Sequence, residues 1–161
     1  MMNPIAFNLF GVSVRWYGVI ITIGILISGY IAILNAKRVN IKADDITDYM
    51  LIAMPFCIIG ARLYYVFFQW EYYKGDILKI INTREGGLAI HGGIIAGILV
   101  AYFYCKRRKL KFLEFFDIIC VSIPLGQSIG RWGNFTNSEA YGTPTNLPWA
   151  IEINGNMVHP T

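Results

Sequence analysis

Long stretches without charge are the feature of this sequence that most constrains its fold. Residues 16–36 are 21 uncharged residues in a row, and three further stretches of 19 to 22 residues carry at most two charges each: 49–70, 86–105 and 112–130. A helix of about 20 apolar residues spans the roughly 30 Å hydrocarbon core of a bilayer. The sequence therefore predicts an all-α fold, a polytopic membrane helix bundle. We expect one membrane domain with four transmembrane helices at about 12–36, 48–69, 88–105 and 112–130, and an external polar segment at 131–161.

The composition excludes several classes of protein. Charged residues make up 15% of the 161 residues and hydrophobic residues 55%, whereas a soluble domain carries about 25% charged residues. A soluble enzyme core, a disordered chain and a nucleic-acid-binding domain are therefore excluded, and no nucleic-acid partner is expected. The three cysteines have no C-x-x-C spacing and lie in or at the ends of apolar stretches. They are expected to be small buried hydrophobes, and neither a metal nor another cofactor is predicted.

Basic residues and tryptophans predict the orientation. The segment 106–111 holds five of the 14 lysines and arginines, and its side of the membrane is expected to be cytoplasmic. With four spans, the N-terminus and residues 131–161 then lie outside. Trp16, Trp70 and Trp132 flank the ends predicted to be external, where tryptophan favours the headgroup region. Glycine pairs at spacing four, at 93 and 97 and at 126 and 130, are typical of closely packed membrane helices.

Two ionisable residues interrupt the predicted spans. Arg62 lies in the second span, where an arginine costs at least about 2.5 kcal/mol unless it has a partner or a wet cavity. It is interpreted either as a structural or snorkelling residue or as a contact to lipid phosphate. His91 lies among four glycines at the outer start of the third span. It is either structural or a group that contacts substrate and accepts a proton.

The densest set of polar groups begins where the fourth span ends. Residues 130–142 combine a guanidinium, two amides and a carboxylate with three glycines. The planar fork of Arg131 suits phosphate oxygens, and an asparagine can hold a neighbouring hydroxyl or fix that fork. The predicted topology brings this segment, Tyr17, Arg62 and His91 to the external face. Such a layer favours a site for an amphiphile whose headgroup faces outward, although Tyr17 is also typical of an interfacial anchor.

These residues resemble a known family. The signature Gly130-Arg131-x-Gly133-Asn134-Phe135-x-Asn137-x-Glu139-x-x-Gly142 is similar to that of the phosphatidylglycerol–prolipoprotein diacylglyceryl transferases. The segments Arg15-Trp16-Tyr17-Gly18, Gly60-Ala61-Arg62 and His91-Gly92-Gly93 resemble other segments of that family, in the same order. The resemblance covers essentially the whole chain.

The resemblance implies a bacterial enzyme of the cytoplasmic (inner) membrane that catalyses the first step of lipoprotein maturation. It would move diacylglyceryl from phosphatidylglycerol to the lipobox cysteine of a prolipoprotein signal peptide, with membrane lipids around it. The implied catalytic residues are His91, Tyr17, Asn134 and Glu139, and the implied substrate-binding residues are Arg131, Arg62, Asn137 and Gly142.

Family members are longer, with further helices and another functional arginine. The chain therefore resembles the N-terminal part of a longer transferase, and we expect a truncated member or a fragment. Two alternatives to an active transferase stay open. One is a truncated membrane protein without activity. The other is a small channel or transporter whose polar path contains Arg62 and His91.

Overall fold

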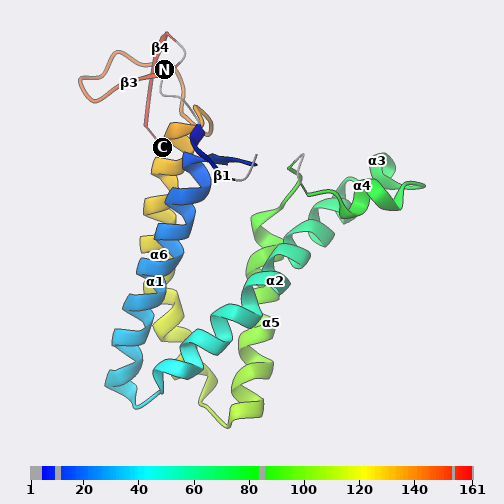
Figure 1. Cartoon of the computed structure of the whole chain (residues 1–161), viewed down its shortest axis with the longest axis vertical. Helices are drawn as coiled ribbons and strands as arrows, with labels where there is room; N and C mark the ends of the chain where they lie inside the picture. The colour runs from blue at the N-terminus through cyan, green and yellow to red at the C-terminus, as the bar shows by residue number, and fades with distance from the viewer. Residues whose placement is uncertain (1–4, 10–11, 84–85, 154, 161) are drawn as a thin grey trace. The chain divides into compact units, whose positions relative to one another are not determined.

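The computed structural model describes residues 5–9, 12–83, 86–153 and 155–160 (Figure 1). The chain forms two compact units. The terminal unit comprises the described residues within 1–32 and 120–161, and the middle unit those within 33–119. That the chain is one membrane domain, as the sequence predicts, stays a prediction.

The long elements are all helices, which confirms the all-α prediction. They are α1 (Trp16–Ala36), α2 (Ala43–Phe68), α5 (Ile90–Arg108) and α6 (Phe112–Thr136). The short elements are β1 (Ile5–Leu9), β2 (Val12–Arg15), the 3-10 helix η1 (Lys37–Val39), α3 (Trp70–Tyr73), α4 (Ile77–Ile81), β3 (Ile151–Ile153) and β4 (Asn156–Val158). β1 pairs with β2, and β3 with β4, each as an antiparallel hairpin.

Three helix boundaries differ from the expected ones by four residues or more. The first helix begins at Trp16 rather than at 12, because the preceding residues with two valines form β2. The second begins at Ala43 rather than at 48, and Asp44 and Asp45 in its first turn favour the positive end of the helix dipole. The fourth long helix, α6, continues to Thr136 rather than ending at 130. The polar signature therefore starts on a helix and not in a loop.

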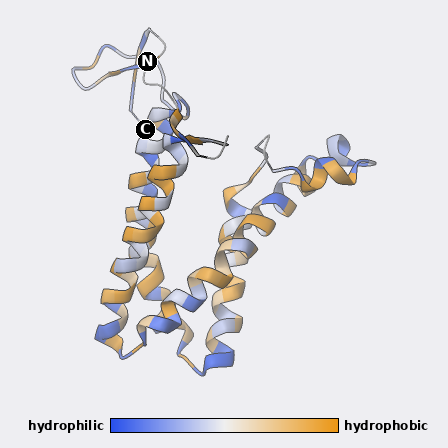
Figure 2. Ribbon diagram, in the orientation of Figure 1, coloured by the Kyte–Doolittle hydropathy of each residue, from blue (hydrophilic) through white to orange (hydrophobic). Residues whose placement is uncertain are grey.

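The exposed surface of the helices is strongly apolar. Figure 2 shows hydrophobic residues along the long helices and hydrophilic residues at the end of α5. Among the described residues, three helical segments are long and apolar enough to cross a membrane: 16–39, 43–68 and 112–136. Among the described residues, ten large hydrophobic side chains on the long helices are more than 60% exposed, namely Leu26, Tyr30, Leu51, Phe67, Phe68, Ile90, Phe103, Leu113, Val121 and Trp132. Lipid rather than water suits such a surface.

The third predicted span corresponds to α5, which is the shortest of the long helices. It has 19 residues, and the last three are Lys106, Arg107 and Arg108. Its apolar part is therefore shorter than that of the other three helices. A crossing by α5 stays a prediction.

In the terminal unit, small residues allow α1 and α6 to pack closely (Figure 1). A Cβ atom added to Gly126 would lie 2.9 Å from Ser28 Oγ on α1, and one added to Gly130 would lie 3.4 Å from Ile21 Cδ1. A Cβ atom at Gly24 would lie 3.2 Å from Ile129 Cγ2 on α6. The predicted packing role of the glycines at 126 and 130 is confirmed.

In the middle unit, α2 and α5 lie side by side and approach most closely at Gly60 and Gly92 (Figure 1). A Cβ atom at Gly92 would lie 2.2 Å from the Gly60 carbonyl oxygen, and one at Gly60 would lie 2.6 Å from Ala96 Cβ. The sequence singled out Gly93 and Gly97. A Cβ atom at Gly97 would lie 3.3 Å from Cys57 Sγ on α2, whereas one at Gly93 would meet nothing nearer than 3.5 Å. Among the described glycines, the tightest contact is therefore at Gly92, one residue before the predicted pair.

This contact leads to a stability prediction. We expect Gly92→Ala to lower the melting temperature of the detergent-solubilised chain by several degrees, because overpacking costs about 1–3 kcal/mol and each kcal/mol shifts Tm by about 2–4 °C at this size. The matched control is Gly93→Ala, whose Cβ atom would be in ordinary contact with Cys57 O. Alanine favours helix over glycine, so the control should melt at the same temperature or slightly higher. If Gly92→Ala and Gly93→Ala melted at the same temperature, the result would contradict the close contact of Gly92 with Gly60.

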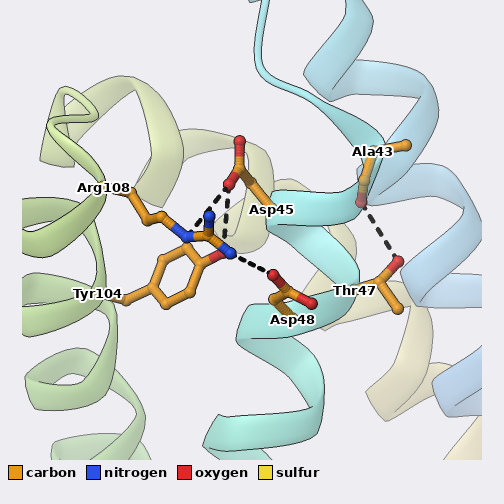
Figure 3. Close-up of polar contacts among 6 residues, drawn as sticks. All are labelled: Ala43, Asp45, Thr47, Asp48, Tyr104 and Arg108. Carbon is orange, nitrogen blue, oxygen red and sulfur yellow. Dashed lines mark hydrogen bonds and ion pairs between the residues drawn. The ribbon is translucent and has the colours of Figure 1, made fainter.

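A polar cluster joins the start of α2 to the end of α5 (Figure 3). Arg108 forms ion pairs with Asp48 and, at 3.7 Å, with Asp45. The Tyr104 hydroxyl donates a hydrogen bond of 3.2 Å to Asp45 Oδ1, and the guanidinium of Arg108 lies 5.6 Å from the centre of the Tyr104 ring. Asp45 is buried, so these partners offset the cost of removing its carboxylate from water.

Candidate functional site

The residues predicted to form the site are divided between the two units. Arg62 and His91 belong to the middle unit. The terminal unit contains the other six: Tyr17, Arg131, Asn134, Asn137, Glu139 and Gly142.

The last turns of α6 carry Arg131 and Asn134. The helix ends because the chain enters the left-handed region at Ser138 (φ 55°) and Ala140 (φ 53°). Main-chain bonds close this end: the Ser138 amide donates to Phe135 O at 3.0 Å, and the Glu139 amide donates to Asn134 O at 3.0 Å. The turn thereby returns Glu139 toward the helix that carries Arg131.

Arg131 and Glu139 line one cavity of about 260 Å³. Its other lining residues are mostly aromatic or aliphatic and come from the end of α6, the following turn, β3 and the C-terminal residues: Trp132, Phe135, Ala140, Tyr141, Ile151, Ile153 and Pro160. The side chain of Asn137 donates to Glu139 Oε1 at 3.3 Å and so orients the carboxylate. The cavity combines an apolar wall with one cation and one anion.

The Arg131 guanidinium is exposed and available to a ligand. Among the described residues, no carboxylate lies within 4.0 Å of it. An exposed guanidinium beside an apolar cavity can bind an anionic headgroup through its fork while the cavity accepts apolar atoms.

Tyr17 packs at the same end of α6. The buried Gly133 lies between Arg131 and Asn134 in the sequence. A Cβ atom at this position would lie 3.0 Å from Tyr17 Cδ2, so the glycine makes room for the Tyr17 ring. Tyr17 is half-buried and lies in the first turn of α1, directly after β2.

Gly142 holds the C-terminal segment in place. Its amide donates to His159 O at 2.9 Å, and the His159 amide donates to Thr143 O at 3.0 Å. The Thr145 amide donates to Met157 O at 3.0 Å. These bonds run alongside β4, the partner of β3, whose Ile151 and Ile153 line the cavity.

In the middle unit, Arg62 is buried and bound to main-chain carbonyls. Its guanidinium donates to Ile80 O, Gly86 O, Gly87 O and Lys79 O at 2.6 to 2.9 Å. Four of its five N–H donors are thus used. It also lines a cavity of about 350 Å³ with Lys79, Asn82, Gln69 and three tyrosines. This geometry supports the structural interpretation of Arg62 more than the phosphate contact.

His91 is the second residue of α5 and is exposed. Its ring stacks on that of Tyr64, with 6.0 Å between ring centres and 25° between planes. The segment before it is tied to α2 by the Ala89 amide, which donates to Ala61 O at 3.0 Å. An exposed imidazole on a fixed helix start is accessible to a substrate.

Sequence reasoning missed the residues of the C-terminal hairpin that line the Arg131 cavity. The signal was present: Asn-Gly at 154–155 separates Ile151-Glu152-Ile153 from Asn156-Met157-Val158. An Asn-Gly dipeptide between short apolar runs is a strong hairpin signal.

Comparisons with known proteins agree with the signature. The family model described as prolipoprotein diacylglyceryl transferase matches residues 4–161. The phosphatidylglycerol–prolipoprotein diacylglyceryl transferase of Finegoldia magna is 52% identical over 160 residues, which is 99% of this chain and 64% of that protein. Those of Clostridioides difficile and of a Clostridium botulinum strain are 50% and 49% identical, over 64% and 68% of their lengths. The chain thus spans about two thirds of the length of these relatives, and it belongs to the prolipoprotein diacylglyceryl transferase family.

Proposed function

We propose that this multi-pass membrane protein transfers diacylglyceryl from phosphatidylglycerol to the lipobox cysteine of prolipoproteins. Family membership supports this proposal, and so do the names of the relatives. The observation that carries it is the cavity in which the exposed Arg131 and Glu139 meet an apolar wall. A cation beside apolar surface suits a substrate with a phosphate headgroup and acyl chains.

In the proposed reaction, a thiolate displaces a phosphate ester. The thiol has an ordinary pKa near 8.5 and must lose its proton, for which His91 is the proposed acceptor. The sulfur then attacks the glyceryl carbon, the carbon–oxygen bond to phosphate breaks, and glycerol phosphate leaves with the electron pair. A thioether remains. Arg131 would stabilise the negative charge on the departing phosphate.

Four further polar side chains and one glycine have proposed roles around this step. Asn137 and Glu139 form the hydrogen-bonded pair described above, which can hold a headgroup hydroxyl. Tyr17 and Asn134 lie at the same end of α6 and are proposed to position the donor. Gly142 is proposed to fix the C-terminal segment through its bond to His159 O, next to Pro160, which lines the cavity.

Donor and acceptor can be tested together in vesicles. Because the relatives are longer, the assay uses the chain and a chimera in which residues 4–161 replace the matching part of the Finegoldia magna protein. We expect release of glycerol phosphate from phosphatidylglycerol only when a lipobox peptide with cysteine is present. The chain alone should react more slowly than the chimera. Release that is equal with a serine peptide would refute thiol transfer.

The proposed location is the bacterial cytoplasmic membrane, with the N-terminus and the Arg131 cavity external. The basic cluster 106–111 supports this orientation. In a variant without native cysteines, we expect Lys109→Cys to be protected from a membrane-impermeant maleimide added to intact cells. Asn146→Cys, which is also exposed, should react and serves as the control. Labelling of position 109 with protection of position 146 would reverse the orientation.

A further inference from the structure

The strongest interactions of Arg62 are with one loop. Its Nε and Nη2 atoms donate to Ile80 O (2.8 Å) and Lys79 O (2.6 Å) at the end of α4. Its Nη1 atom donates to Gly86 O (2.8 Å) and Gly87 O (2.9 Å), just before α5. One planar guanidinium therefore joins the end of α4 to the residues just before α5. Because the donor is charged, these hydrogen bonds are stronger than those of a neutral donor.

The surroundings of Arg62 fit a buried guanidinium. The residue is 7% exposed, and its Cζ atom lies 4.9 Å from the centre of the Tyr73 ring. The negative ends of four carbonyl dipoles and the ring face offset part of the cost of removing the charge from water. The position thus suits a fork-shaped cation, because several carbonyl acceptors are fixed around it.

The loop in turn is built to receive the guanidinium. Gly86 and Gly87 have φ angles of 89° and 77°, which side chains rarely adopt. A Cβ atom at Gly87 would lie 2.3 Å from Arg62 Nη1 and 3.0 Å from Tyr65 Cε1. The second glycine is needed both for its backbone conformation and for the approach of Arg62.

Three consecutive residues of α2 hold the segment that leads to His91. Arg62 binds the carbonyls at 86 and 87, Ala61 O accepts the Ala89 amide at 3.0 Å, and Gly60 meets Gly92 in the closest backbone contact. His91 lies between two of these fixed points. Its place at the start of α5 therefore depends on this row of contacts.

We propose that Arg62 is a positioning residue, which fixes the loop before α5 and thereby the place of His91. This inference rests on the proposed function for its effect on catalysis, but not for its effect on the loop. A lysine at 62 keeps the charge yet cannot reach four carbonyls in one plane. Loss of the fork should loosen the segment 86–92 and move the imidazole. The charge of Arg62 would act through the loop and not on the lipid phosphate.

The first test follows amide hydrogen exchange in the full chain. We expect Arg62→Lys to speed exchange of the Ala89 amide by about tenfold or more, because local opening becomes easier. Gly87→Ala leaves Arg62 in the chain but obstructs its Nη1 atom, so it should have the same effect. The matched control is Lys79→Gln, which removes a cation that lines the same cavity but keeps the carbonyl that Arg62 binds. Unchanged exchange in both Arg62→Lys and Gly87→Ala would overturn the proposal, whether or not the protein transfers lipid.

The second test separates positioning from phosphate binding in the transfer assay. For Arg62→Lys we expect kcat to fall by about tenfold while KM for phosphatidylglycerol stays within about twofold, because a misplaced group slows the reacting step. This loss of kcat should be smaller at a pH above the pKa of the peptide thiol. The thiol is then already ionised, so no residue has to remove its proton. Lys79→Gln should leave both constants unchanged. A raised KM in Arg62→Lys and in Lys79→Gln, with no pH dependence of the loss, would instead assign Arg62 to an anion-binding cavity.

Discussion

Replacing Arg131 with alanine should lower the rate of diacylglyceryl transfer about a hundredfold in the chimera, and replacing it with lysine about tenfold. Removal of one donor that stabilises developing charge costs about a hundredfold or more in rate. Lysine keeps the charge but loses the planar fork, so an intermediate loss is expected. The measurement is glycerol phosphate release at saturating peptide.

Stability measurements distinguish this loss from misfolding. Arg131 is exposed and has no carboxylate partner within 4.0 Å among the described residues, so neither variant should change the melting temperature by more than a degree or two. Arg107→Lys, on the exposed end of α5, is the control for an arginine-to-lysine change. If Arg131→Lys transferred at the normal rate, Arg131 would not be a fork-dependent phosphate contact.

Replacing His91 with asparagine should slow transfer at pH 7 by about 30- to 100-fold, within the range that general base catalysis contributes. At pH 7 only a few per cent of a free thiol is ionised. At pH 9.5, above the thiol pKa of about 8.5, most of the peptide is already thiolate. The rate of the variant should then approach that of the parent to within a few-fold.

The chain offers a control of the same residue type. It has two histidines, and the second, His159, is exposed in the C-terminal segment. His159→Asn should behave like the parent at both pH values. A His91→Asn loss that is the same at pH 7 and pH 9.5 would rule out proton removal as the role of His91.

The helices could be predicted because a bilayer demands long uncharged segments. The spans at 12–36, 48–69 and 112–130 correspond to α1, α2 and α6 because few residue types satisfy that demand. Helix ends were less predictable. Arg131 and Asn134 suggest a loop by composition, yet the helix continues through them to Thr136, where the turn at Ser138 and Ala140 ends it.

The chemical character of the site was also visible in the sequence, because Arg131, Asn137 and Glu139 are close together along the chain. The hydrogen-bond partners of Arg62 were not. Its partners are main-chain carbonyls, which every residue carries, so no sequence pattern marks Lys79, Ile80, Gly86 and Gly87 as its acceptors. Only the return of the loop onto α2 identifies them.

The central proposal is that these residues serve transfer of diacylglyceryl to a thiol, and mass spectrometry of the acceptor peptide tests it most directly. The chimera is incubated in vesicles that contain phosphatidylglycerol with isotope-labelled acyl chains, together with a lipobox peptide. The proposal predicts a peptide heavier by one labelled diacylglyceryl group on its cysteine, formed about a hundredfold more slowly with Arg131→Ala. An unmodified peptide, under conditions in which the Finegoldia magna relative modifies it fully, would contradict the proposal.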